Sequence, residues 1–452
     1  MSSGTTVIDG AHVVTVSGAE YPVGFIVVTD GRIAQVGAGP APDIAGAERI
    51  DARGCVATPG LVNTHNHLYQ WATQGLFADN TLFEWLVGSY EMWHRLDADV
   101  VADTTTAGMS WLALSGCTTA SDHHYIFPSG RGDIVAAEVA AARAVGIRLD
   151  LARGSMDRGQ SDGGLPPDTV VETTAGAIDA TAAAIDAHHD PSPASMTRIA
   201  VAPCSPFSVS RDLMTEAAKL ARTAGVRLHT HVAETLDEHE QCLAEFGCTP
   251  VEYAEKLGWL GADVWFAHAV HLSDDAIARI AQTGTGIAHC PSSNARLGAG
   301  ICRVTELVGA GAVVGLGVDG PASSELTGIA GEMRQALFMA RARKGPQALS
   351  SRTALHMATL GGARVLGRDA ELGSIEAGKL ADIALWRVDG FGHDVIDDPV
   401  VALTFGPTPP LERLLVGGST VVERGELRTV PAESAAAAGR SAHRALVKEV
   451  SR

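Results

Sequence analysis

The chain has 452 residues, of which 46% are hydrophobic, and this composition supports a large folded core and excludes wholesale disorder. Its 52 acidic residues outnumber 34 Lys and Arg, and the net charge of −18 without any basic cluster argues against a nucleic-acid-binding protein. The seven cysteines are scattered and form no CxxC pair, which favours reduced thiols in a cytoplasmic protein over a disulfide framework or a cysteine-based zinc site.

Residues 1–58 contain short alternating apolar runs, which predict a small β structure. Asp30-Gly31 lies between two such runs and predicts a hairpin turn. The first residues, MSSGTTVIDGAHVVTV, have no basic segment followed by an apolar run, so no signal peptide is expected. The apolar stretches of the chain are only strand-sized, and we expect no membrane association.

Between residues 59 and 371, short apolar runs alternate with Ala-rich helical segments. Such alternation predicts a parallel sheet that is buried on both faces. Eight units in this length favour a closed (β/α)₈ barrel, and the first run is not followed by the GxGxxG of an open dinucleotide-binding sheet. The expected strands are Val56–Val62, Cys117–His123, Ile147–Arg153, Arg198–Pro203, Val226–Val232, Val264–Val270, Gly284–His289 and Ala312–Asp319.

From residue 372 the β pattern returns, in LGSIEAGKLADIALWRV and RLLVGGSTVVERGEL. We expect residues 1–58 and 372–452 to combine into one small β-sandwich beside a barrel of residues 59–371. Residues 433–450 are Ala-rich and amphipathic and predict a surface helix at the end of this segment. The fold class is therefore α/β, a (β/α)₈ barrel with a small domain from both chain ends.

Polar residues close four of the expected barrel strands, where a buried strand should continue apolar. They are His65 and His67, His229 and His231, His268, and Asp319. Residues two apart on a strand face the same side, and the carboxyl ends of barrel strands share one mouth. Taken singly, each of these residues is more simply explained by a structural role than by metal binding. Together they predict a site for zinc or a similar divalent ion.

The segments PGLVNTHNH, HTHVAET, FAHAVHL, HCPSSNARL, GLGVDG and LGSIEAGKLADIALW resemble the amidohydrolase superfamily, in the subgroup of chlorotriazine hydrolases and nucleobase deaminases. They occur in the family's order over nearly the whole chain. The resemblance implies that one metal ion is held by His65, His67, His231 and Asp319. It also implies catalytic roles for Glu234, His268 and Asp319 in handling protons.

The resemblance implies a hydrolytic deaminase in which the metal activates a water. Asp319 would take a proton from this water, Glu234 would protonate the ring nitrogen of the substrate, and His268 would hold the water. The expected cofactor is one divalent ion of the zinc type, and nitrogen and oxygen ligands suit Zn²⁺, Fe²⁺ and Mn²⁺ alike. For Glu234 the alternative is an ordinary exposed carboxylate in an acid-rich segment. His229, His123 and His124 are expected to support the site or the core.

The substrate is expected to be a small heterocycle, read by Gln70, Arg153, Cys204 and Trp85. Cys204 stands where guanine deaminases carry an arginine, and LARGSMDRGQSDGGLPPD, APCSPFSVS and CTTASDHHYIFP resemble 8-oxoguanine deaminases more closely. Each of these residues has a structural alternative: a surface Gln70, a salt-bridged Arg153, and core packing for Trp85, as for Trp93 and Trp111. The predicted reaction is 8-oxoguanine to urate and ammonia.

Other functions stay open at this point. The loops after the seventh and eighth strands, HCPSSNARL and DGPASSELTG, depart from the 8-oxoguanine deaminase pattern and leave isoxanthopterin, another pterin or a pyrimidine as candidate substrates. An s-triazine hydrolase that removes chloride or an alkylamine is the nearest rival, although the Asp after strand eight favours displacement of an amine. A non-catalytic barrel used for assembly is a further alternative, and a homo-oligomer is expected by family analogy.

Overall fold

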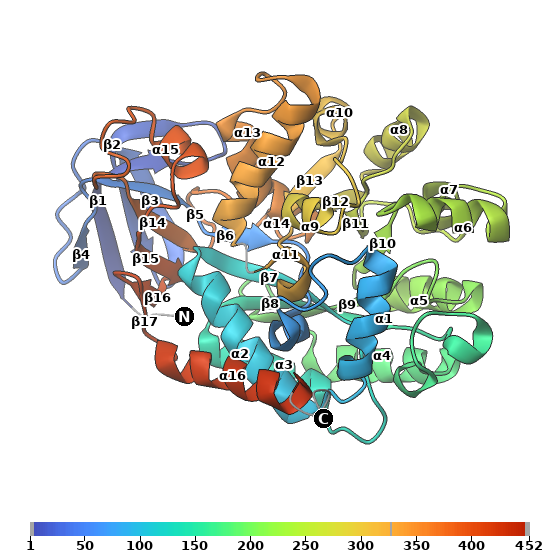
Figure 1. Cartoon of the computed structure of the whole chain (residues 1–452). Coiled ribbons are helices and arrows are strands. Elements are labelled where there is room, and N and C mark those ends of the chain that lie inside the picture. Colours follow the sequence, from blue (N-terminus) through green and yellow to red (C-terminus); the bar gives the residue numbers. More distant parts are fainter. Residues whose placement is uncertain (1–3, 326–327, 448–452) are drawn as a thin grey trace.

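The computed structural model describes residues 4–325 and 328–447, and it consists of a closed barrel beside a second sheet (Figure 1). Eight parallel strands follow one another around the barrel in chain order, which confirms the predicted fold class. The barrel strands are β6 (Leu61–Asn63), β7 (Cys117–His124), β8 (Arg148–Ser155), β9 (Thr197–Pro203), β10 (Leu228–Val232), β11 (Val264–His268), β12 (Gly286–His289) and β13 (Val313–Leu316).

Helices follow the barrel strands and cover the outside of the barrel (Figure 1). Their ends carry local signals: α5 begins after Ser210, whose side chain accepts from the backbone of Leu213, and it ends at Gly225 in the left-handed region. The α-helices are α1 (Leu82–Trp93), α2 (Ala98–Leu114), α3 (Ile134–Val145), α4 (Thr174–His188), α5 (Arg211–Ala224), α6 (Leu236–Phe246), α7 (Pro250–Lys256), α8 (Asp274–Thr283), α9 (Pro291–Arg296), α10 (Val304–Gly309), α11 (Pro321–Ser324), α12 (Ile329–Lys344), α13 (Ser351–His356), α14 (Gly362–Val365), α15 (Pro399–Phe405) and α16 (Ala432–Val447). Short 3₁₀ or π turns are η1 (Leu68–Thr73), η2 (Gln160–Asp162), η3 (Asp168–Val170) and η4 (Met357–Gly361).

The second sheet is built from both ends of the chain, as expected, and its nine strands are hydrogen-bonded into one sheet. β5 from the N-terminal part pairs antiparallel with β14 from the C-terminal part. The predicted hairpin joins β2 to β3, with positive φ angles of 49° at Asp30 and 78° at Gly31. The strands are β1 (Thr5–Val14), β2 (Glu20–Thr29), β3 (Arg32–Ala38), β4 (Glu48–Asp51), β5 (Cys55–Pro59), β14 (Ile383–Arg387), β15 (Leu411–Val416), β16 (Ser419–Glu423) and β17 (Glu426–Leu427).

The first expected barrel strand, Val56–Val62, was wrong as a single strand. Cys55–Pro59 is β5 of the small sheet, and only Leu61–Asn63 enters the barrel. The backbone N–H of Gly60 between them bonds the carbonyl of Asp382 in the small sheet. Both segments are buried and apolar, so the hydrophobic pattern does not reveal that the chain passes from one sheet to the other.

The C-terminal helix α16 packs against α2 and η1 of the barrel (Figure 1). Its buried positions are Ala435, Gly439, Ala442 and Leu446, a spacing that places them on one face. Residues 448–450 of the expected helix lie outside the described residues. The described helices include none that is both long and apolar enough to cross a bilayer. All seven cysteines are buried and free.

A buried ion pair joins the barrel to the small sheet. The Arg148 guanidinium donates two hydrogen bonds of 3.0 Å to the Asp382 carboxylate, and both side chains are almost fully buried. Asp382 also accepts from the backbone N–H of Gly417 at 2.7 Å. Replacement of Asp382 would leave the guanidinium buried without its counter-charge, which is far more costly than loss of an exposed pair.

We therefore expect Asp382→Asn to lower the free energy of unfolding by about 3–5 kcal/mol in denaturant titrations. Glu216→Gln, which breaks an exposed pair with Lys219 on α5, serves as the control and should change stability little. Equal effects of the two substitutions would contradict a role of the Arg148–Asp382 pair in joining the two parts.

Candidate metal centre and substrate cavity

Four side chains from strands β6, β10 and β13 converge at the carboxyl end of the barrel. The Nε2 atoms of His67 and His231 are 3.2 Å apart, and Oδ1 of Asp319 lies 3.4 Å from His65 Nε2 and 3.3 Å from His67 Nε2. Atoms bound tetrahedrally to zinc at about 2.0–2.1 Å are about 3.3–3.4 Å from one another. The distances His67–His231, His65–Asp319 and His67–Asp319 are thus compatible with ligands of one such ion.

The backbone adopts uncommon conformations where these strands end. His268, Ala269 and Asp319 have positive φ angles of 70°, 48° and 59°, and Ala233 just after β10 has 57°. Such angles are rare outside glycine and cluster at functional sites, where the surrounding fold holds them in place. β11 therefore ends at His268, two residues earlier than the sequence pattern predicted.

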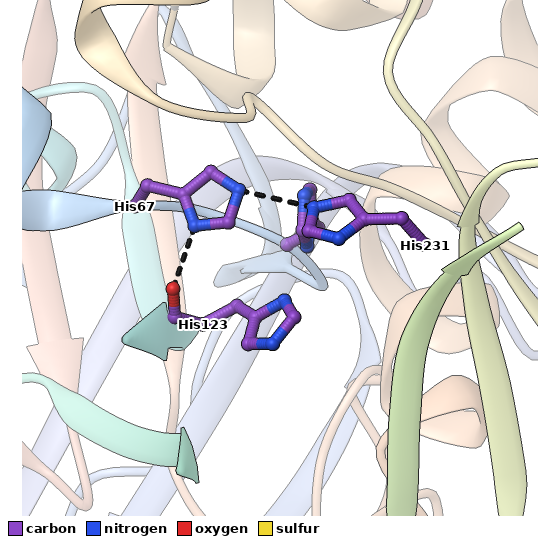
Figure 2. A group of neighbouring side chains, drawn as sticks. His67, His123 and His231 are labelled. Atoms are coloured by element: carbon purple, nitrogen blue, oxygen red, sulfur yellow. Dashed lines mark hydrogen bonds between the residues drawn. The ribbon is translucent and has the colours of Figure 1, made fainter. Parts of the chain in front are cut away.

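In each of the three candidate histidine ligands, the ring nitrogen Nδ1 points away from the centre and has a hydrogen-bond partner. His65 Nδ1 bonds Nε2 of His229 at 2.9 Å, while His67 Nδ1 and His231 Nδ1 donate to the carbonyls of His123 and Cys204, each at 2.6 Å (Figure 2). These partners fix the ring orientation and leave each Nε2 directed at the centre. The sequence left open whether His229 supports the site or the core and favoured a structural role for His123; in the structure the His229 ring and the His123 carbonyl contact candidate ligands.

The electrostatics suit cation binding. Burial keeps the imidazoles neutral: it lowers the pKa of His67 to about 4 and that of His231 to about 3, and the pKa of His65 falls well below its usual range. Burial alone would raise the pKa of Asp319, but the hydrogen bond to His65 and the charge of His268 hold it well below its usual range. Neutral imidazoles and one carboxylate are the protonation states that bind a divalent ion.

Glu234 and His268 lie beside this ligand set. Glu234 Oε2 is 3.6 Å from His268 Nε2, and His268 Nδ1 donates to Oδ1 of Asn294 at 3.0 Å. Burial raises the pKa of Glu234 to about 7, opposed by His268 and increased by Asp319. Burial by itself would lower the pKa of His268, but the carboxylates of Glu234 and Asp319 outweigh it and the pKa is raised. Glu234 can therefore exchange a proton near neutral pH, while the two carboxylates favour the protonated form of His268.

Glu238 holds the backbone that carries Glu234. Its buried carboxylate accepts hydrogen bonds of 2.8 Å from the backbone N–H groups of both Ala233 and Glu234. Sequence reasoning missed this residue, although its place three after Thr235 at the start of α6 is that of a capping-box acid. Ser293 was missed as well; its hydroxyl donates to Oδ2 of Asp319 at 2.5 Å.

A cavity of about 410 Å³ opens from the ligand set. Its wall is mainly aromatic and aliphatic, and no lysine or arginine of the described residues lines it. This lining favours a flat, uncharged ring over a phosphorylated substrate. The lining residues are His67, Gln70, Leu82, Trp85, Leu86, Tyr90, Tyr125, Cys204, Phe207, His231, Glu234, His268, Leu297, Asp319 and Ser323.

Three of the four expected substrate-binding residues line this cavity. Gln70 Oε1 and Trp85 Nε1 are buried without a hydrogen-bond partner, so both are available to a ligand. Gly320 leaves the room that Gln70 needs, because a Cβ there would lie 1.7 Å from Gln70 Oε1. Burial raises the pKa of the Cys204 thiol to about 12, so this side chain stays neutral.

Arg153, the fourth, does not line the cavity and is corrected as a substrate-binding residue. Its guanidinium forms two hydrogen bonds with the Glu172 carboxylate and lies over the Phe127 ring, 4.1 Å from the centroid. A buried arginine needs such a counter-charge, and the carboxylate comes from a segment 19 residues away in sequence. Trp93 is buried in the core, and Trp111 lies on the outside of the barrel, half-exposed.

The cavity wall also contains residues that sequence reasoning did not assign to the site. Tyr90, Tyr125, Phe207 and Leu297 come from α1, from the segments after β7 and β9, and from the end of α9. Isolated apolar residues of this kind carry no motif, and only the folded loops bring them together.

Comparison with known proteins identifies the family. The model of the amidohydrolase family matches residues 56–419. An 8-oxoguanine deaminase from Pseudomonas aeruginosa is 42% identical over 94% of this chain and 95% of its own length. An isoxanthopterin deaminase from an unknown prokaryotic organism is 36% identical over 89% of this chain and 88% of its own length.

A solved structure of a hydrolase also has the same fold as this chain. The atrazine chlorohydrolase of Arthrobacter aurescens complexed with zinc has a TM-score of 0.92 and 32% identity, and the match covers 97% of this chain and all of the other. A zinc-binding relative with the same architecture supports the presence of a metal site at the carboxyl end of this barrel.

Proposed function

The chain belongs to the amidohydrolase family and is a hydrolase, and we propose that it removes an amino group from a flat heterocycle, with 8-oxoguanine as its main substrate. The observation that carries this proposal is the position of Glu234 and His268, which line the same mainly apolar cavity as the candidate ligands His67, His231 and Asp319, a cavity that no described lysine or arginine lines. Relatives that act on 8-oxoguanine and isoxanthopterin support the choice of a fused, lactam-containing ring.

We propose that His65, His67, His231 and Asp319 hold one zinc ion. His65 Nε2 supports this assignment, because it is fully buried and lies 3.4 Å from Oδ1 of Asp319, another of the proposed ligands. When bound, the ion would supply an acidified water at neutral pH. The same ligands would accept Fe²⁺ or Mn²⁺.

The protein's own groups then handle the protons. Asp319 accepts a proton from the attacking water, and Ser293 and the backbone N–H of Gly320 orient its two oxygens. Glu234 donates a proton to the ring nitrogen beside the amino-bearing carbon, which lets that carbon become tetrahedral. His268, held by Asn294, hydrogen-bonds the attacking oxygen. Asp319 then passes the proton it took from the water to the amino group, the carbon–nitrogen bond breaks and ammonia leaves. The remaining hydroxyl proton goes back to Glu234, which leaves a ring carbonyl.

Ring recognition is assigned to Gln70, Trp85 and Cys204. The Gln70 amide offers a donor and an acceptor to a lactam edge, while the Trp85 N–H donates to a carbonyl. We further propose a cytoplasmic homo-oligomer that binds neither nucleic acid nor membranes; the seven buried, free cysteines support a reducing compartment.

The proposal predicts the order of substrates. Ammonia release from 8-oxoguanine should exceed that from guanine, because Cys204 offers no cation of the kind that guanine deaminases use. The measurement is a panel of purines, pterins, pyrimidines and triazines assayed for ammonia and for chloride. Guanine as the best substrate would contradict the assignment.

An s-triazine hydrolase is the second candidate, favoured by the superposition on atrazine chlorohydrolase. The mainly apolar cavity wall would also accept an alkyl-substituted ring. The same panel separates the two: chloride release from a chlorotriazine without ammonia release from any purine or pterin would replace the deaminase proposal.

A further inference from the structure

A second group of candidate ligands lies outside the catalytic cavity, between β7 and α3. Along β7 the side chains alternate, so that His123 faces the metal centre while Asp122 and His124 point away from it. Glu138 on α3 meets them there: its Oε2 is 3.2 Å from Nδ1 of His124. One ligand atom from each of Asp122, His124 and Glu138 lies within 4.8 Å of the other two.

The hydrogen bonds of this cluster leave only acceptors facing one another. His124 Nε2 is 3.0 Å from the carbonyl oxygen of Ile126, so it carries the ring proton and leaves a lone pair on Nδ1. The carboxylate of Glu138 has no hydrogen-bond partner on either oxygen, and Oδ2 of Asp122 has none. Three electron-rich groups at such distances require a positive charge between them, which is either a proton shared by the Asp122 and Glu138 carboxyls or a metal ion.

No side-chain cation supplies that charge. Among the described residues no lysine or arginine pairs with Asp122 or Glu138, and the nearby Arg153 guanidinium is bound to Glu172. All three members of the cluster are at most 1% exposed, so water does not screen them either. Two unpaired carboxylates in this position would be very costly to bury. Burial raises the pKa of Glu138 to about 8, which shows how unfavourable the uncompensated charge is.

We propose that Asp122, His124 and Glu138 bind a second divalent transition-metal ion of the zinc or manganese type, separate from the catalytic one. Two carboxylates neutralise such an ion, and a neutral imidazole completes a set of nitrogen and oxygen ligands. Because the cluster is sealed, the ion would enter while the chain folds and would exchange slowly afterwards.

The second ion would stabilise the position of the candidate catalytic ligand His67 without contacting it. Asp122 Oδ1 accepts a hydrogen bond of 2.6 Å from the backbone N–H of Leu68, next to His67. The carbonyl of the neighbouring His123 holds His67 Nδ1. An ion that ties these β7 residues to α3 would therefore fix the position of one catalytic ligand without touching the substrate.

The test is the metal content of the purified full-length chain, by elemental analysis, together with anomalous diffraction at the absorption edge of the metal found. We expect two ions per chain and a second anomalous peak between Asp122, His124 and Glu138. Glu138→Gln should contain one ion fewer and lose only the second peak. Glu216→Gln, which removes an exposed carboxyl on α5, is the control and should leave both ions in place.

One ion per wild-type chain, with its anomalous peak only at His65, His67, His231 and Asp319, would overturn this proposal and leave the proposed function intact. The cluster would then be neutralised by protons. A chain without any stoichiometric metal would contradict the proposed function as well. The wild-type measurements decide the question even if Glu138→Gln fails to fold.

Discussion

A His231→Ala variant is expected to lose the catalytic ion and at least about 10⁴-fold in kcat/KM, since without the ion the attacking water returns from a pKa of about 7 toward its value in bulk solvent. The structure gives the reason for the loss of the ion. His231 Nε2 belongs to the proposed ligand set, and its Nδ1 is fixed by the carbonyl of Cys204, so its removal takes away one oriented ligand. Metal content and steady-state kinetics measure the two effects.

His289→Gln is the matched control for this variant. His289 is equally buried and also closes a barrel strand, but it lies outside the cavity lining. The control should retain the ion and most of the activity. A His231→Ala protein that keeps its full metal content would show that the ligand set is wrong. Such an outcome would point to His123, which lies within 4.8 Å of the other histidines (Figure 2).

The candidate ligands could be selected from the sequence because an ionisable residue at the end of a buried strand is costly unless it has a partner or faces the barrel mouth. His65, His67, His231 and Asp319 each follow an apolar run, and barrel geometry brings all strand ends to one mouth. Period-two alternation then decides which neighbours face inward. In the structure His67 lies within 3.3 Å of His231 and Asp319, and Asp319 lies 3.4 Å from His65, while their assignment as the ligands of one ion stays a prediction.

Contacts that depend on loop paths could not be predicted in the same way. Arg153 was expected to close a strand as the ligands do, but it lies within β8, and its side chain pairs with Glu172, a residue without any motif. The sequence pattern predicts β5 and β6 as a single strand, because burial in either sheet favours the same apolar residue types. The expected domain boundaries at residues 58 and 372 and the expected roles of the site residues stay predictions.

A Glu234→Gln variant is expected to keep the catalytic ion but lose about 10²–10⁴-fold in kcat, the usual contribution of one positioned acid–base group. Glutamine preserves the shape of the side chain and leaves the Glu238 bonds to the backbone unchanged, so the cavity should still bind substrate. The substitution removes a carboxyl whose pKa burial raises to about 7. Among the described residues, Asp319 is the only other carboxyl that lines the cavity. KM should therefore change far less than kcat.

Asp237→Asn separates this role from a general effect of charge in the acid-rich segment after β10. Asp237 is exposed on the first turn of α6 and does not line the cavity, so its replacement should leave both kinetic parameters unchanged. If Glu234→Gln turned over substrate at a near-normal rate with its ion in place, proton donation to the ring would have to come from His268. His268 is the one neighbouring group whose raised pKa would let it act as an acid at neutral pH. The reaction would then require the carboxylate of Asp319 but not that of Glu234.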